Sequence, residues 1–165
     1  MGESESVRGW EDDARDREMG KIEILIYLLA QTNNKYQMEI INSHRELRVY
    51  KKSFEKAMDI FRETKKFPKE ELYSLTDQIR RSSRSVSSNI AEAFRKRRYP
   101  KSFCSKLNES EAEAAETQNW LDFALECDYL TKETHKILDK AYEEIIGMLV
   151  NMQKSPEKWG IIKNL

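Results

Sequence analysis

From about residue 45 onward, apolar and small side chains recur at three- and four-residue steps, the period of a helix that buries one face. The pattern predicts four amphipathic helices, over residues 46–66, 68–98, 100–128 and 131–152. The breaks between them have typical helix-end chemistry. Proline cannot continue a helix from within, and it follows Phe67, Tyr99 and Ser155. Thr131 suits the N-cap of the fourth helix.

Four helices of this length joined by short loops favour an all-α, antiparallel up-down-up-down four-helix bundle over residues 38–165. The scarcity of Gly (5) and Pro (3) argues against a turn-rich β protein. Residues 1–37 differ in character, with an acidic start and a short apolar run at Ile22–Ala30. We expect them to form an N-terminal extension holding one short, weakly packed helix around residues 21–31. We expect Trp159 in the tail to pack back on the bundle.

The first helix carries its apolar stripe at Leu47, Tyr50, Phe54, Ala57, Met58 and Phe61. The second places serines where bulky residues would be usual. With Ile79 at heptad position a, Leu72, Val86 and Ala93 also fall at a, Leu75, Ser82 and Asn89 at d, and Ser83 and Ile90 at e. The middle of this buried seam is therefore small, which lets a neighbouring backbone come close. Serine hydroxyls can bond to a carbonyl one turn back, so their burial costs little.

Ser82 and Asn89 are the predicted polar residues of this core. Asn89 has two readings: a buried amide that fixes helix register, or a ligand-binding or catalytic group. The first is favoured, because no His, Cys or second acid joins it at metal or catalytic spacing.

The second helix is also strongly cationic. Eight of the 24 residues at 78–101 are Lys or Arg: Arg80, Arg81, Arg84, Arg95, Lys96, Arg97, Arg98 and Lys101. The helical wheel places Arg80, Arg81, Arg84, Arg95 and Arg98 opposite the seam. Lys96 and Arg97 extend this run where the helix frays toward Pro100, and Lys101 begins the next helix, so we expect one contiguous stripe. The third helix is acidic, with no Lys or Arg between Glu109 and Asp128. The chain is thus polarised, although its 29 basic and 29 acidic residues give no net charge.

Three interpretations of the stripe remain open. It is a solvated face, or it pairs with the acidic helix of the same or a neighbouring subunit, or it contacts phosphate. The planar arginine fork suits phosphate oxygens, and such binding would be directed at the backbone, with little sequence readout. The phosphate interpretation makes all eight cations nucleic-acid contacts.

The sequence contains no pattern that indicates an enzyme. His44 and His135 have no catalytic partner at a suitable spacing, and no glycine-rich phosphate loop or metal-ligand pattern is present. We therefore expect no catalytic, cofactor or metal site and no small-molecule substrate. Cys104 and Cys127 lie in no CxxC pattern and are expected to be reduced. The run Ile22–Ala30 is too short to span a bilayer and the acidic stretch before it is wrong for a signal peptide, so we expect a cytoplasmic protein without a membrane partner.

The stretches LRVYKKSFEKAMDIF, FPKEELYSLTDQIRRSSRSVSSNIAEAFRKRR and EAAETQNWLDFALECDYL resemble the four helix bundle proteins, also called 23S rRNA intervening-sequence proteins. The middle stretch is the most specific. A more distant similarity is to the accessory variability determinant of diversity-generating retroelements. The chain departs from the family pattern at Ala93, where Gly is usual, and in residues 1–37. Met38 resembles the start of family members, so residues 1–37 are expected to be an upstream extension or to follow from a misplaced start codon.

The resemblance implies a left-handed antiparallel bundle that assembles into a homopentameric barrel. It also implies an association with inserts in 23S rRNA genes or, in the retroelement relatives, with nucleic acid and a reverse transcriptase. The function we expect is a non-enzymatic oligomer that binds nucleic acid, RNA in preference to DNA, through the basic helix face. The alternative is a structural scaffold or an adaptor for a protein partner, with no direct nucleic-acid binding.

Overall fold

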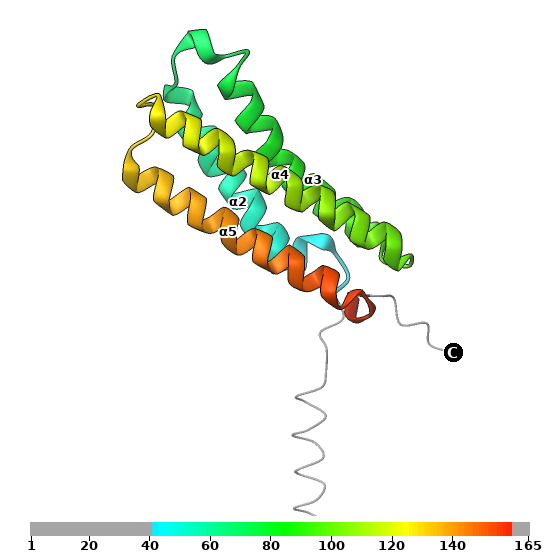
Figure 1. Cartoon of the computed structure of the whole chain (residues 1–165). Helices are drawn as coiled ribbons and strands as arrows, with labels where there is room; N and C mark the ends of the chain where they lie inside the picture. Colours follow the sequence, from blue (N-terminus) through cyan, green and yellow to red (C-terminus); the bar gives the residue numbers. More distant parts are fainter. Residues whose placement is uncertain (1–40, 160–165) are drawn as a thin grey trace, which may run out of the picture. The chain divides into compact units, whose positions relative to one another are not determined.

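The computed structural model describes residues 41–159, and four long helices dominate them (Figure 1). These are α2 (Arg48–Glu63), α3 (Leu75–Lys96), α4 (Pro100–Glu126) and α5 (Lys132–Lys154). Short 3₁₀ helices occupy the ends and one connection: η1 (His44–Glu46), η2 (Thr64–Lys66), η3 (Lys69–Glu71) and η4 (Pro156–Trp159). The described part of the chain contains no strand, and the predicted all-α four-helix bundle is confirmed. The expectations for residues 1–37 fall outside the described residues.

Each long helix has two neighbours in the bundle. α3 packs between α2 and α4, and α5 packs between α4 and α2. Hydrogen bonds across α3 and α4 join Val86 to Ser110 and Ser82 to Thr117, so residue numbers fall on one helix as they rise on the other. The contacts of Gln118 with Asp139 and of Glu111 with Gln153 show the same relation for α4 and α5. These neighbours therefore run in opposite directions, as Figure 1 shows.

Aliphatic side chains fill the centre of the bundle. Ile79, Val86, Ile90, Leu107, Leu121, Ile145 and Leu149 are fully buried. Burying a side chain of this size contributes roughly 1.5–3 kcal/mol to the free energy of unfolding. Trp159 lies partly buried against this core, which confirms the expectation for the tail. Thr131 accepts a hydrogen bond from the Thr134 amide at 3.1 Å, so the predicted N-cap of α5 is also confirmed.

The small residues of α3 permit a close approach of α4. The hydroxyls of Ser82, Ser83 and Ser87 each donate to the carbonyl three residues earlier in α3, at 3.0–3.4 Å. From α4, the Ser110 hydroxyl reaches the Val86 carbonyl at 2.8 Å, and the Thr117 hydroxyl lies 2.9 Å from that of Ser82. A hydroxyl can reach the backbone of a neighbouring helix only where no bulky side chain separates the two.

The predicted start of the second helix is wrong. α3 begins at Leu75, and the residues after Pro68 form the short helix η3 instead. The Glu71 carboxylate accepts the Leu75 amide at 3.2 Å and also bonds the Ser74 hydroxyl, which caps α3 at this point. Leu72, predicted in the seam, is 45% exposed. The helical spacing of apolar residues continues through the connection before Leu75, which is not α-helical. Periodicity alone therefore could not locate the start of α3.

Asn89, too, was placed in the buried seam wrongly, because its side chain is partly exposed. Ser82 is buried, but in the following turns the interior positions are Val86, Ile90 and Ala93. A straight helix of 3.6 residues per turn drifts by about 20° per heptad from a strict seven-residue repeat. The drift moves Asn89 to the edge of the seam and brings Ile90 to its centre.

Candidate nucleic-acid interface

The eight cations of α3, of the turn after it and of the start of α4 lie at the surface. Arg81, Arg84, Arg95, Arg98 and Lys101 are exposed, and Arg80, Lys96 and Arg97 are partly exposed. Among the described residues, two of the eight have an acidic partner: Arg81 lies 4.0 Å from Asp77 and Lys96 lies 3.8 Å from Glu92. The other six make no ion pair with any carboxylate of the described residues. This set is Arg80, Arg84, Arg95, Arg97, Arg98 and Lys101.

One group of these cations surrounds a single aromatic ring of α2. The Arg80 and Arg84 guanidinium carbons lie 5.1 and 5.7 Å from the centre of the Phe61 ring, and the Lys65 ammonium lies 4.8 Å from it. Arg80 also donates from Nε to the Thr64 hydroxyl at 2.8 Å. The π face of Phe61 offsets part of the repulsion among the three cations. Three cationic side chains thus gather around one aromatic ring, and the Thr64 hydroxyl holds Arg80 there.

A second group lies at the C-terminal end of α3. Arg97 donates to the Phe94 carbonyl at 2.7 Å and lies 3.8 Å above the Phe94 ring. Burial lowers the pKa of Arg97, and the nearby charges of Arg95 and Arg98 lower it further. The three guanidinium groups therefore act on one another, and none of them pairs with a carboxylate of the described residues.

The expected single contiguous stripe is therefore divided. Arg84 and Arg95 are separated by eleven positions, about 16 Å along the helix axis at 1.5 Å per residue. Lys96 and Lys101 lie on the α4 side, where they line an open depression of about 260 Å³ together with Lys106.

Arg81 also faces an acidic residue of α4, Glu113. Burial and the neighbouring Glu116 raise the pKa of Glu113, while the charge of Arg81 lowers it.

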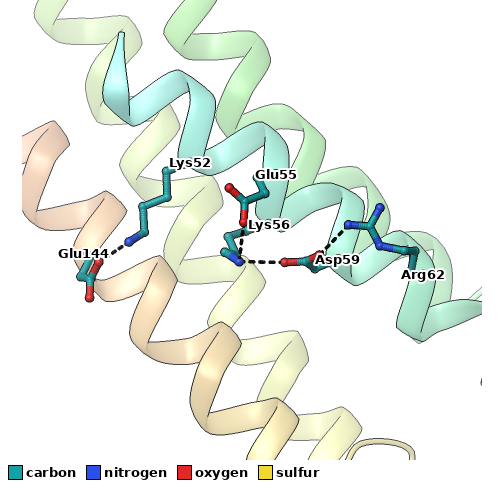
Figure 2. Close-up of polar contacts among 6 residues, drawn as sticks. All are labelled: Lys52, Glu55, Lys56, Asp59, Arg62 and Glu144. Atoms are coloured by element: carbon teal, nitrogen blue, oxygen red, sulfur yellow. Dashed lines mark hydrogen bonds and ion pairs between the residues drawn. The ribbon is translucent and has the colours of Figure 1, made fainter.

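Several cations of α2 have acidic partners. On α2, Lys56 and Arg62 contact Asp59 at 2.8 and 2.7 Å, and Lys52 pairs with Glu144 of α5 (Figure 2). Burial alone would raise the pKa of Asp59, but the hydrogen bonds from Lys56 and Arg62 outweigh it and the pKa is lowered. By contrast, Arg80 and Arg84, which approach α2 from α3, have no carboxylate partner among the described residues.

The structure adds aromatic residues that the sequence pattern had assigned to the core. Phe54 is 51% exposed, and its ring stacks on that of Tyr50, with centroids 6.1 Å apart and an interplanar angle of 23°. His44 contacts Tyr50 edge-on at 4.7 Å and approaches Phe94 at 6.3 Å. A row of rings thus runs from the C-terminal end of α3 along α2.

His44 links Phe94 of α3 to Tyr50 of α2 in this row. Burial lowers its pKa, and the positive charges of Arg45 and Arg95 lower it further. We call His44, Tyr50, Phe54 and Phe61, together with Arg80, Arg84 and Arg95, the α2–α3 face. The cations of this face were predicted from the sequence. The only sequence signal for its aromatic residues was the spacing of Tyr50, Phe54 and Phe61, which equally fits a buried stripe.

The structure also shows the surroundings of the other candidate residues, His135, Cys104 and Cys127. His135 Nε2 lies 2.7 Å from an Asp122 oxygen, where it joins α5 to α4. Within residues 41–159, no group of three or more His, Cys, Asp or Glu side chains could hold a metal ion. Cys104 and Cys127 are free thiols. None of the described helices has the length and apolar character needed to cross a membrane.

With this geometry established, comparison with known proteins identifies the family. A family model described as 23S rRNA-intervening sequence protein matches residues 45–151, a span that includes α2, α3, α4 and most of α5. The chain belongs to this family. The resemblance inferred from the sequence is therefore confirmed.

A solved structure supports the assignment. It is the crystal structure of a protein of unknown function from the S23 ribosomal protein family of Bacteroides thetaiotaomicron. This chain is 31% identical to it with a TM-score of 0.59, and the match covers 64% of this chain and 98% of that one. No curated protein matches the chain. Neither the family description nor that of the solved structure names an enzymatic activity.

Proposed function

We propose that this member of the 23S rRNA-intervening sequence family is a non-enzymatic RNA-binding protein that contacts phosphate through α3. The observation that carries the proposal is the set of six cations on α3 and its C-terminal end that lack a carboxylate partner in the described chain. Exposed Arg84, Arg95, Arg98 and Lys101 are suited to direct contact. Arg80 and Arg97 are held by Thr64 and Phe94 and would add charge at a fixed place.

The electrostatic argument alone does not separate RNA from DNA, because both present the same phosphate groups. The description of the family names 23S rRNA, and this supports RNA as the partner. Arginine dominates the set, and its two parallel N–H donors match the geometry of phosphate oxygens better than a lysine ammonium does.

We also propose that the protein self-associates, as the homopentamer that the family resemblance implies. The separation of charge supports self-association, because α4 exposes Glu109, Glu116, Asp122 and Glu126 on a helix adjacent to α3. The same observation favours a second candidate function: a scaffold or protein-partner adaptor in which basic and acidic helices mate between subunits, without direct nucleic-acid binding.

Charge reversal of Arg84, Arg95 and Arg98 to Glu tests the RNA proposal. The matched control reverses Lys132, Lys136 and Lys140, which are also exposed and lie on α5, so both variants lose the same charge. We expect the α3 variant to lose retention on RNA at low salt and the α5 control to keep it. Equal binding by the α3 variant and the parent would refute the assignment.

Size-exclusion chromatography with light scattering, before and after nuclease treatment, tests the scaffold alternative. The scaffold predicts that the α3 variant dissociates into smaller species and that the parent binds no RNA. The RNA proposal predicts that the parent copurifies with nucleic acid that nuclease removes, and that the α3 variant does not.

A further inference from the structure

The most unusual surface feature of the bundle is Phe54, a large apolar ring that is half exposed between two cationic groups. Contacts between α2 and α3 fix the register of the two helices: Thr64 meets Arg80, Phe61 meets Arg84, and His44 meets Phe94. Interpolating between these contacts places Phe54 at the level of Ser88–Ala91. At this level Ser88 and Ala91 are small and Ile90 is buried in the core, which is consistent with the exposure of the Phe54 ring.

The groups around Phe54 are arranged in sequence along the α2–α3 face. Arg80 and Arg84 lie at one end beside Phe61, and Arg95 lies at the other end near His44. The Tyr50 ring stacks against the Phe54 ring, and Phe54 is still 51% exposed. The face is thus cationic at both ends and aromatic between them.

From this arrangement we infer that the ligand of the α2–α3 face is single-stranded RNA, with an unpaired base stacked on Phe54 and with phosphates of the same strand, on either side of that base, at Arg84 and Arg95. The inference deepens the proposed RNA-binding function and rests on it. A protein aromatic ring cannot stack on the bases inside a continuous duplex, because each base face is already covered by its neighbours. An unpaired base has a free π face, and its stacking on an aromatic side chain tolerates any sequence. Charge complementarity favours this occupant over an apolar protein segment, because such a segment would leave the flanking guanidinium groups without partners.

Two substitutions of Phe54 test the inference, measured by fluorescence anisotropy on the full-length protein. The probes are a labelled oligouridine of about 15 nucleotides and a blunt RNA duplex of the same length. We expect Phe54→Leu to weaken oligouridine binding about tenfold, since stacking on one aromatic side chain is worth that much or more. We expect Phe54→Trp to keep or strengthen binding, and both variants to bind the duplex as the parent does.

The matched control is Phe123→Leu on α4, because Phe123 is also 51% exposed and lies outside this face. We expect it to bind both probes as the parent does. If Phe54→Leu binds oligouridine like the parent while the triple α3 charge reversal abolishes binding, the stacking inference is wrong and the RNA proposal stands. If neither variant changes binding, both are wrong. A fall in oligomer mass on Phe54→Leu would show that a second copy of the chain covers the ring and would overturn the inference.

Discussion

The Ser110 hydroxyl of α4 donates a hydrogen bond to the Val86 carbonyl of α3 over 2.8 Å, in the fully buried interior of the bundle. The bond exists because α3 carries Ser82, Ser83 and Ser87 where a typical bundle helix carries leucine. The contact explains the run of serines that first distinguishes this sequence. The serines let α3 and α4 pack with their backbones close together, while the arginines of α3 lie on its outer side.

Substitutions of Ser110 measure this close packing. Ser110→Ala should lower the free energy of unfolding by about 1 kcal/mol, because it removes one buried hydrogen bond while the Val86 carbonyl keeps its partner within the helix. Ser110→Leu should cost several times more, because the added volume has no space between the helices. Urea denaturation measures both, with exposed Ser105→Ala as the control. Equal stability of Ser110→Leu and the parent would contradict the packing of α3 on α4.

Gly147 offers a stabilising substitution. It lies on the exposed side of α5, and a Cβ added there would meet nothing within 4 Å. Gly147→Ala should therefore raise the free energy of unfolding by about 0.5–1 kcal/mol, since glycine loses more backbone entropy in a helix than alanine does. The reverse change at an exposed site on α4, Ala112→Gly, should lower it by a similar amount. A destabilised Gly147→Ala protein would show that another surface packs against this position.

The ion pairs of α2 predict how stability depends on pH. Hydrogen bonds to Lys56 and Arg62 lower the pKa of Asp59 despite its partial burial, and Lys52 lowers the pKa of Glu144. A carboxyl whose pKa is depressed by folding contributes stability above its unfolded pKa and loses it as the pH falls through the folded value. The ordinary values here are 3.8 and 4.5, so this contribution should be present at neutral pH and lost in acid.

Urea denaturation at a series of pH values between about 3 and 7 tests this prediction. The double variant Asp59→Asn and Glu144→Gln should lose stability less steeply in acid than the parent. Parallel profiles for the two proteins would mean that the contacts in Figure 2 do not shift these carboxyl groups in solution.

The sequence predicted the four helices and the small seam correctly, because both depend on local periodicity. Its errors have physical causes. Leu72 kept the helical period across a connection that Glu71 and Ser74 interrupt, and periodicity cannot detect such a cap. Asn89 was misplaced because a strict heptad ignores the drift of a straight helix.

The candidate site was predicted only in part. The eight cations can be read directly from the sequence, since a dense charged run on a helix must lie outside the core. The exposure of Phe54 cannot be read in this way, because it depends on which α3 residues lie opposite. The division of the cations between the α2 side and the α4 side depends on the same packing. Both features needed three-dimensional contacts between helices.

The most direct test of the account is the salt dependence of RNA affinity. We predict that the logarithm of the association constant for oligouridine falls linearly with the logarithm of salt concentration. Neutralising Arg84, Arg95 and Arg98 to Gln should make the slope shallower by about 2, since each lost phosphate contact on a single strand contributes about 0.7. An unchanged slope in this triple variant would contradict the claim that α3 binds RNA through its exposed guanidinium groups.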